Sequence, residues 1–444
     1  MNNNLNILHY SIGVPPFRAG GLPRYTLDIA RAELQIGHQV SILYPEGIDY
    51  KYPSFHIVKG KIIEGIQLYK LKNPILVPIL LGVSCPDKMI RESEKDIAEL
   101  RAFINTLNPT VVHFHTIMGI SLEFVSEIKK MGIKVVLTTH DFYGLCLKGN
   151  FIDRIGELCV DRRLDKCALC NYGAPNAIKL RAISEPLLKP IIRKLQKKTS
   201  ISYGQGVSLQ KKEHQYDIDA YRELLDYYEK IIKEMDIVHF NSSQTSEQYL
   251  KYVNISNYCI IPITDSFVKD RRSVKYFLPN KKLKLGFIGV LKPYKGFPIL
   301  KNILKDLNPE EWELNVWGNH VGSDEIAGIH YRGMYNSDTI QTVFDEMDLL
   351  VVPSIWYETF SLVTMEALSF GTPVLVSQNV GAKDVVRKYN NAFVYSTTEQ
   401  LKNMLLLLIK NRDSLKEYNK QIMENPFPYT MQDHAKEIVN KLYR

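Results

Sequence analysis

The sequence predicts an α/β protein in which doubly wound parallel sheets form at least two domains. Near the N-terminus, the apolar segment 6–10 precedes a loop rich in Gly and Pro and then an amphipathic helix. In the second half, the apolar run 349–352 has the composition of a buried parallel strand, and a loop, a helix and the apolar segment 374–376 follow it. A chain of 444 residues is long for a single hydrophobic core, so two or three domains are expected.

The charge and the apolar segments restrict the cellular setting and the partners. Lys and Arg number 56 against 48 Asp and Glu, and the formal charge of +8 is modest, so we predict no nucleic-acid partner. This charge fits attraction to nucleotide phosphate or to an anionic membrane surface. Residues 1–13 lack the features of a secretory signal, and the longest apolar run, 75–83, is too short to span a bilayer. We therefore predict a cytoplasmic protein that can bind peripherally to the inner face of the membrane.

The first strand and helix form the start of a βαβ unit. Apolar residues of the helix recur at intervals of three and four and form one stripe, comprising Leu22, Tyr25, Ile29, Ala32 and Ile36. Gly37 ends this helix, and segment 40–43 is the second strand. Gly20 and Gly21 lie in the loop where such units bind phosphate, although a tight turn that needs positive φ explains a double glycine equally well.

His140 and Asp141 follow a strand at the edge of the sheet where α/β proteins carry their chemistry. Between the first unit and this pair, alternating and amphipathic patterns predict edge strands or a hairpin, two helices and two strands, at residues 57–71, 88–107, 121–131, 110–115 and 133–139. The last of these strands delivers the His-Asp pair at its carboxyl end. A histidine at a strand end is often structural, so the pattern alone leaves both a structural and a catalytic role open.

Four of the six cysteines follow the His-Asp pair with the spacing C-x12-C-x7-C-x2-C, at Cys146, Cys159, Cys167 and Cys170. In a reducing compartment such a group favours a metal over disulfides. Thiolates bind zinc tetrahedrally, and one C-x2-C turn supplies two ligands. We predict a structural zinc with no open coordination position, and four reduced free thiols are the alternative.

The segment 177–200 carries seven basic residues against one acid, Glu185, and also has an apolar face. Such a stretch can lie on an anionic membrane, and it can equally be a solvated helix packed on its own domain. A long helix starts near residue 218. Asp217 and Asp219 stand at the start of that helix, where we interpret them as caps and not as metal ligands.

Segment 353–374 contains two carboxylates beside a predicted anion site. After strand 349–352, Glu358 lies in a loop and Glu366 lies one turn into a helix that stops at the sequence Gly-Thr-Pro. The N-terminus of a helix that faces the carboxyl end of a parallel strand binds phosphate readily. Two carboxylates there are costly unless each binds hydroxyl groups of the same ligand. The alternative is an ordinary βαβ repeat with two solvated glutamates.

The pattern P-S-x-x-x-E-x-F-x-L-V-x-x-E-A, followed by G-x-P-V, resembles the signature of the family-4-type retaining glycosyltransferases. That family has the GT-B fold and includes enzymes of bacterial surface-polysaccharide synthesis. The resemblance covers nearly the whole chain except about 145–233, where some relatives have a similar Cys-rich insertion. It implies two Rossmann-like domains that face a central cleft. It also implies transfer of a sugar from a nucleoside-diphosphate sugar to a glycan or lipid-linked glycan acceptor.

This resemblance also implies a domain organisation. Residues 1–265 would form the acceptor-side domain, with the Cys-rich and basic insertion at about 145–233. A linker would follow at 266–282, and residues 283–424 would form the domain that binds the nucleotide sugar. A last helix within 425–444 would cross back to the first domain. Patterns along the second half predict strands and helices at 284–289, 314–318, 337–346, 399–410 and 431–442.

The resemblance further assigns roles to individual residues. His140 would orient the donor sugar, Lys295 would hold the diphosphate, and Glu358 would bind hydroxyls of the donor sugar. Glu366 would bind the ribose, and the helix N-terminus after Phe360 would share the charge of the leaving group, so the chemistry would need no metal ion. The donor-binding residues implied in this way are Gly20, Gly21, Asp141, Gly289, Met334, Ser361, Leu362 and Glu366.

Two positions depart from the family pattern. Val290 occupies the place of an Arg that holds the diphosphate, and Ser361 occupies the place of a Gly beside the phosphate. Lys292 and Arg332 are candidates to replace that Arg. The departure at Val290 leaves a non-catalytic GT-B scaffold that binds nucleotide sugars as an alternative to a transferase. A GT-B nucleotide-sugar epimerase is a further alternative, because it would have the same fold.

Overall fold

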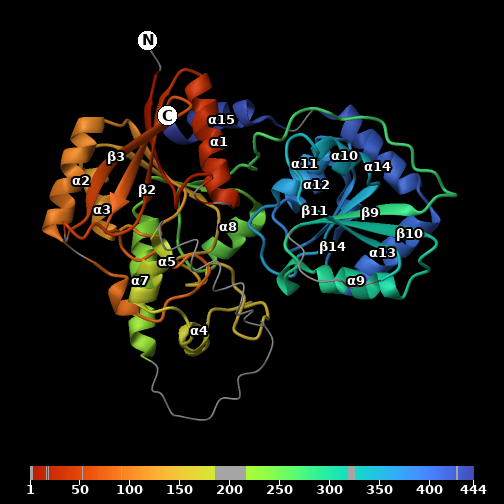
Figure 1. Cartoon of the computed structure of the whole chain (residues 1–444), viewed down its shortest axis with the longest axis horizontal. Helices are drawn as coiled ribbons and strands as arrows, with labels where there is room; N and C mark the ends of the chain where they lie inside the picture. Colours follow the sequence, from red (N-terminus) through yellow and green to blue (C-terminus); the bar gives the residue numbers. More distant parts are fainter. Residues whose placement is uncertain are drawn as a thin grey trace. The chain divides into compact units, whose positions relative to one another are not determined.

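The chain folds into two compact units, each built on one sheet (Figure 1). This computed structural model describes residues 4–16, 18, 20–52, 54–91, 93–185, 217–318, 326–426 and 429–444. The first unit comprises Met1–Asn241, Ser246–Ile261 and Met431–Arg444, and the second comprises Ser242–Thr245 and Pro262–Thr430. The prediction of an α/β protein with two parallel-sheet domains is confirmed.

The first unit contains the larger sheet. Its strands are β1 (Asn6–Tyr10), β2 (Gln39–Pro45), β3 (His56–Ile63), β4 (Ile66–Lys72), β5 (Val111–Phe114), β6 (Lys134–Thr139), β7 (Ile237–Phe240) and β8 (Tyr258–Ile260). They lie in the order β3-β4-β2-β1-β5-β6-β7-β8. All neighbouring pairs are parallel except β3 and β4, which form the hairpin expected at residues 57–71. The register of β1 and β5 places His9 beside His113.

Helices flank this sheet and include the last segment of the chain. They are α1 (Gly21–Gln35), α2 (Glu94–Leu107), α3 (Leu122–Lys130), α4 (Leu164–Asn171), α5 (Ala177–Ser184), α7 (Ile218–Lys233), α8 (Ser243–Leu250) and α15 (Met431–Ile438), which continues as a wider turn at Val439–Tyr443. Asp217 caps α7 by accepting a hydrogen bond from the backbone N–H of Ala220 at 2.9 Å, as predicted. α15 packs against α1, where Tyr25 Oη and His434 Nε2 are 2.7 Å apart.

The second unit has a smaller sheet in which every pair is parallel. Its strands are β9 (Leu283–Ile288), β10 (Trp312–Trp317), β11 (Ile329–Gly333), β12 (Leu349–Val352), β13 (Val374–Ser377) and β14 (Val394–Tyr395), in the order β11-β10-β9-β12-β13-β14. Its helices are α9 (Phe297–Lys305), α10 (Ile340–Asp345), α11 (Leu362–Leu368), α12 (Lys383–Asn390), α13 (Thr398–Lys410) and α14 (Asp413–Glu424), with short 3-10 turns η2 (Pro293–Lys295) and η3 (Asn391–Phe393). All four residues of β12 are buried, as expected for a strand covered on both faces.

The segment 266–282, which we expected to be a linker, packs on the second unit. The backbone N–H of Arg271 donates to the carbonyl of Ser369 at 2.9 Å. The ammonium group of Lys275 donates to the carbonyl of Phe344 at 2.7 Å. These contacts attach the segment to α11 and α10, and the boundary between the units falls after residue 261.

Two further expectations concern the membrane. No helix in the described part of the chain is long and apolar enough to cross a bilayer. Of the basic stretch 177–200, α5 covers Ala177–Ser184, whereas residues 186–200 lie outside the described residues.

Candidate functional site

A paired lysine and glutamate lie in the loops at the carboxyl end of the second sheet. The ammonium group of Lys295 donates to Oε1 of Glu358 at 2.7 Å, and the hydroxyl of Ser354 donates to Oε2 at 2.5 Å. The side chains of Lys295 and Glu358 are 22% and 14% exposed, so a ligand in solution can reach both. A cation and a carboxylate in contact at such a position can bind phosphate and hydroxyl groups of one ligand.

The turn η2 that carries Lys295 is pressed against the loop after β12. Gly296 ends this turn at φ 76°, and a Cβ on it would lie 1.7 Å from the carbonyl oxygen of Pro353. Only glycine allows so close an approach of two backbone segments. The ring of Tyr294 packs on that of Trp356 with 4.7 Å between centroids, and the ammonium group of Lys295 lies 5.1 Å from the Trp356 centroid. Backbone packing thus places Lys295 beside Glu358.

The loop that carries Glu358 is fastened on its other side to the loop after β13. The backbone N–H of Glu358 donates to the carbonyl of Asn379 at 2.9 Å, and the N–H of Gly381 donates to the carbonyl of Glu358 at 2.8 Å. These bonds form a short parallel bridge between Glu358 and Val380. A Cβ on Gly381 would lie 2.0 Å from the carbonyl oxygen of Thr359, so this contact also requires glycine. The carboxylate therefore stands on a rigid backbone.

Helix α11 begins directly after this loop and carries Glu366. Glu366 is buried, and the hydroxyl of Tyr335 donates to its Oε2 at 2.6 Å. Ser361 precedes the helix, and Leu362 is its first residue. The hydroxyls of Ser361 and Thr364 are buried and have no hydrogen-bond partner among the described residues. Buried hydroxyls of this kind are available to bind a polar ligand.

The glycine-rich start of the second unit carries no arginine. Gly289 follows β9 with φ 155°, a conformation that residues with a side chain rarely adopt, and Val290 after it is 46% exposed. Arg332, a candidate to replace the missing cation, has its Nε 2.8 Å from Oδ1 of Asn315 and 3.9 Å from a carboxylate oxygen of Glu346. Both contacts involve Nε of Arg332, and its side chain is 45% exposed.

The turn after β11 places two residues differently. Met334 is 76% exposed, whereas Tyr335 beside it contacts Glu366. The expectation that this turn contacts the nucleotide base stays a prediction.

In the first unit, His140 and Asp141 lie at the carboxyl end of β6 and are partly exposed. His140 Nε2 is 3.2 Å from His115 Nδ1, and the rings of His140 and Tyr25 pack with 4.7 Å between centroids. Burial lowers the pKa of His140 to about 3, so this imidazole is neutral at neutral pH. The carboxylate of Asp141 accepts from the backbone N–H of Tyr143 at 2.8 Å, and burial raises the pKa of Asp141 to about 6.

Gly20 and Gly21 lie at the start of α1. Gly20 is the N-cap with φ 136°, a conformation that favours glycine, and Gly21 is the first helical residue. The turn requirement therefore explains Gly20, and a phosphate contact of this pair stays a prediction.

Two families match this chain. Residues 19–165 match the family described as glycosyltransferase family 4, and residues 268–425 match the one described as glycosyl transferases group 1. The chain belongs to the family-4-type glycosyltransferases with the GT-B fold.

Individual relatives of this glycosyltransferase agree with the family. An uncharacterized 42.6 kDa protein in the cps region of Klebsiella pneumoniae is 21% identical over 454 residues, which cover 99% of this chain and 96% of the relative. An uncharacterized glycosyltransferase of Methanocaldococcus jannaschii is 29% identical over 121 residues, or 24% of this chain. The first curated relatives are matched over 31% of their own length. Among solved structures, Anabaena HepE in complex with UDP and glucose has a TM-score of 0.57 at 12% identity, and the alignment covers 99% of each chain.

The structure brings some of the predicted site residues of the glycosyltransferase together. In the second unit, Lys295 contacts Glu358, and α11 follows the same loop. In the first unit, His140 contacts His115, which the sequence analysis did not single out. His113 lies in β5 and His115 directly follows this strand, and two histidines in an otherwise apolar segment were the signal available in the sequence.

The four predicted zinc ligands share one neighbourhood but do not converge. Cys167 and Cys170 lie on α4, and Cys146 and Cys159 lie in the preceding loops. Burial raises the pKa of Cys167 to about 12, with the other three thiols contributing to the rise. Among the described residues, one group of three or more potential metal ligands has its ligand atoms within 4.8 Å of one another. This group consists of His9, His113 and His115 and includes no cysteine. In this arrangement the sulfurs therefore do not form a closed zinc site.

Proposed function

We propose that this glycosyltransferase transfers a sugar from a nucleoside-diphosphate sugar to a glycan or lipid-linked glycan acceptor, with retention of configuration. The observation that carries the proposal is the contact between Lys295 and Glu358, held by rigid backbone at the carboxyl end of the second sheet. Parallel α/β sheets bind their ligands at this end.

The pair suits the departure of a diphosphate. Glu358 takes one of the three N–H donors of Lys295, which leaves the others for phosphate oxygens. A cation that is already in place stabilises the charge that develops on the leaving group, because the protein need not reorganise during the reaction. We infer that the chemical step needs no metal ion for this reason, and that Glu358 binds hydroxyls of the donor sugar while Glu366 binds the ribose.

Retention is supported by the engagement of both carboxylates. Glu358 accepts hydrogen bonds from Lys295 and Ser354, and Glu366 accepts one from Tyr335. Both carboxylates are therefore engaged by neighbouring side chains, which does not favour either of them as the general base. In a retaining reaction of this family, the leaving phosphate accepts the proton of the acceptor on the same face. Such a step requires no separate base. His140 of the first unit would orient the donor sugar.

The relatives support the choice of substrates. HepE was solved with UDP and glucose, which are parts of a nucleoside-diphosphate sugar. The Klebsiella relative is encoded in a cps region, which supports a role in polysaccharide synthesis.

The decisive experiment measures release of nucleoside diphosphate. A thermal-shift panel of nucleoside-diphosphate sugars first selects the donor, and release of the diphosphate is then followed with and without a glycan acceptor. A transferase releases it in an acceptor-dependent manner. Binding without release would support a scaffold, which the uncharged Val290 favours, and conversion of the donor sugar without acceptor would support an epimerase. Either result would overturn the proposal.

We also propose a structural zinc on Cys146, Cys159, Cys167 and Cys170. The mutual influence of these thiols supports a shared site, although zinc would have to draw the sulfurs to about 3.8 Å from one another, given Zn–S bonds of about 2.3 Å. Metal analysis of the purified protein is expected to find one equivalent of zinc. A content well below one equivalent would leave free thiols as the correct interpretation.

A further proposal concerns an anionic membrane surface. α5 exposes Ile178 next to Lys179, an apolar and a basic side chain that could contact lipid together. Flotation with vesicles that contain an anionic lipid is expected to carry the protein, and Lys179→Glu should weaken the binding. Absence of the wild-type protein from the floated fraction would contradict membrane binding.

A further inference from the structure

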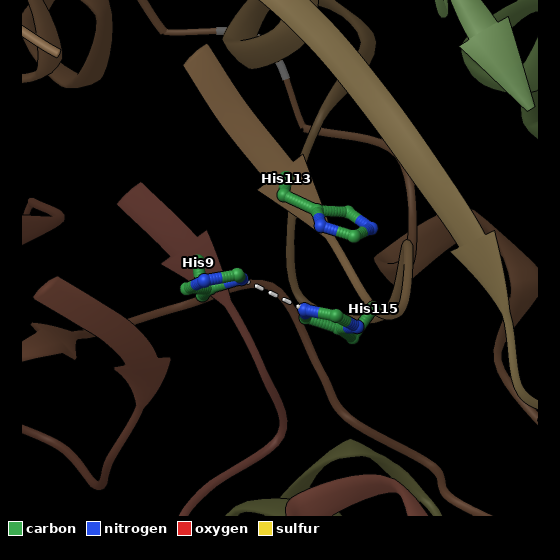
Figure 2. Close-up of side chains that lie close together, drawn as sticks. All are labelled: His9, His113 and His115. Atoms are coloured by element: carbon green, nitrogen blue, oxygen red, sulfur yellow. Dashed lines mark hydrogen bonds between the residues drawn. The ribbon is translucent and has the colours of Figure 1, made fainter. Parts of the chain in front are cut away.

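A chain of hydrogen bonds runs through the interior of the first unit from Glu33 to His140. Glu33 Oε2 and His9 Nε2 are 2.6 Å apart, and His9 Nδ1 and His115 Nε2 are 2.9 Å apart, as Figure 2 shows for the two histidines. His115 Nδ1 then lies 3.2 Å from Nε2 of His140. Glu33 and His9 are fully buried, so bulk water does not reach the start of this chain.

A second chain leaves the other oxygen of Glu33 and ends on a backbone carbonyl. Its contacts are 2.8, 2.6, 2.6, 2.9 and 2.7 Å long, and its members in order are Tyr443, His113, Thr138, His239 and the carbonyl of Ile261. Every ring nitrogen and hydroxyl of the second chain therefore has a partner within it. The direction of the hydrogen bonds can be deduced, because the number of protons on each group is limited.

The side chains of the second chain are neutral at neutral pH. Burial, with the neighbouring histidines, lowers the pKa of His113 well below its usual range. Burial lowers the pKa of His239 to about 4. Burial also raises the pKa of Tyr443 well above its usual range, so the phenol keeps its proton. Each imidazole consequently has one N–H and one acceptor nitrogen, and the tyrosine has one proton to donate.

The carbonyl of Ile261 determines the direction of the second chain. A carbonyl oxygen only accepts, so His239 must donate from Nε2 and accept at Nδ1. Thr138 must then donate to His239 and accept from Nε2–H of His113. Nδ1 of His113 is left as an acceptor, and Tyr443 donates its single hydroxyl proton to it.

Because Tyr443 donates its single proton to His113, it has none left for its contact with the carboxyl group of Glu33. Tyr443 Oη and Glu33 Oε1 are 2.8 Å apart, and this contact is a hydrogen bond only if Oε1 of Glu33 carries a proton. Without this proton, Glu33 would be a buried negative charge. Such a charge would be costly, because the only basic group that Glu33 contacts in the described part of the chain is the imidazole of His9. The hydrogen-bond pattern and the cost of burying a charge therefore both require a proton on Oε1 of Glu33.

The protonated carboxyl in turn determines the direction of the first chain. With the proton on Oε1, Oε2 of Glu33 is an acceptor and takes the Nε2–H of His9. Nδ1 of His9 then accepts from Nε2–H of His115. Nδ1 of His115 accepts from Nε2–H of His140, so the proton of the neutral His140 lies on Nε2 and its Nδ1 is an acceptor.

We propose that Glu33 is protonated in the folded protein and is a positioning residue that, through His9 and His115, holds His140 as the Nε2–H tautomer. In this tautomer, Nδ1 of His140 accepts a hydrogen bond from a hydroxyl of the bound sugar. That last step alone rests on the proposed function. The protonation of Glu33 and the tautomer of His140 are properties of the protein without substrate.

A metal ion on these histidines is a different use of the same residues. Ring nitrogens of His9, His113 and His115 lie within 4.8 Å of one another, which is close enough for a shared ion. Each of the six ring nitrogens, however, already has a hydrogen-bond partner. An ion would have to break both chains, so the geometry favours the hydrogen-bonded network.

Infrared spectroscopy of the full chain tests the protonation of Glu33. Wild-type protein at neutral pH should show the carbonyl band of a buried protonated carboxyl, and Glu33→Gln should lack it. Because an amide has the donor and acceptor of a protonated carboxyl, Glu33→Gln should retain most of the transfer activity, whereas Glu33→Leu should lose at least about 10-fold, by analogy with the loss of buried hydrogen bonds. Identical wild-type and Glu33→Gln spectra would overturn the proposal.

The tautomer is tested by nitrogen NMR of histidine-labelled protein. The signals of His140, assigned with His140→Gln, should show the Nε2–H tautomer in wild-type protein and Glu33→Gln, and a mixture of tautomers in Glu33→Leu. His56→Gln is the matched control, because His56 pairs with Asp49 outside the network and its loss should leave the His140 signals in place. Should Glu33→Leu fail to fold, a wild-type His140 protonated on Nδ1 would still refute the proposal.

Discussion

The two units hold their polar side chains in opposite ways. In the second unit, Lys295 and Glu358 are charged, partly exposed and paired directly with each other. In the first unit, Glu33 and the histidines around it are buried and linked to one another by hydrogen bonds. The charged pair of the second unit therefore lies where a ligand can reach it, whereas the buried polar groups of this network in the first unit are hydrogen-bonded to one another. The difference predicts different responses to mutation and to pH.

Removal of the exposed pair should have the largest effect. Lys295→Ala and Glu358→Ala should each lower transfer about 100-fold or more, because each removes a group placed for the charge that develops in the transition state. Turnover is measured as acceptor-dependent release of nucleoside diphosphate, and circular dichroism checks that the fold is retained.

The matched control for this pair is Lys305→Ala, which removes an exposed lysine at the end of α9. Its turnover should stay within about 2-fold of wild type, as for most surface substitutions. Wild-type turnover in both Lys295→Ala and Glu358→Ala would refute the proposed role of the pair.

Acid should destabilise the first unit in particular. Burial lowers the pKa of His239 to about 4 and that of His140 to about 3, against about 6.5 in the unfolded chain. The unfolded state therefore binds more protons below pH 6.5, and stability is full above that pH and is lost as the pH falls toward 4. The fully buried His239 should cost about 1.4 kcal/mol per pH unit in this window, and the partly exposed His140 should cost less. Groups that face these two histidines include Tyr25, His115, Cys259, His434 and Glu437. Asp141, whose pKa burial raises to about 6, acts in the opposite direction and offsets part of this loss as the pH falls below 6.

Tryptophan fluorescence separates the two units in this experiment. All three tryptophans, Trp312, Trp317 and Trp356, lie in the second unit. Between pH 7.5 and pH 5.5, the urea midpoint from circular dichroism should fall more than the midpoint from fluorescence. Equal shifts would show that the buried histidines do not control the acid sensitivity.

A smaller effect is expected when the support of Glu358 is weakened. Ser354→Ala removes the buried hydroxyl that donates to Oε2 of Glu358 and leaves the contact with Lys295. Hydrogen bonds to charged groups are worth about 1.5–3 kcal/mol, so turnover should fall roughly 10-fold. Ser337→Ala, which removes an exposed hydroxyl that donates to Asp338, is the control. An equal loss in both variants would contradict a specific role for Ser354.

Much of the fold followed from local patterns, and the exceptions have physical reasons. Strands such as β12 were predicted because a buried parallel strand needs an uninterrupted apolar run. Helix α14 was missed, since only four of its residues, Leu415, Tyr418, Asn419 and Ile422, are buried and its surface is strongly polar. The segment 266–282 has the composition of a linker, but its Arg and Lys side chains and its backbone are hydrogen-bonded to the second unit.

The sequence by itself determined the parallel α/β architecture, the family, and the presence of Lys295, Glu358 and His140 as candidate site residues. Only the tertiary structure decided which groups meet. Lys295 and Glu358 are 63 positions apart, and they touch because Gly296 lets η2 pack on Pro353. The buried partners of His140 were equally hidden, because a network of protons depends on contacts between strands and helices that no local pattern encodes.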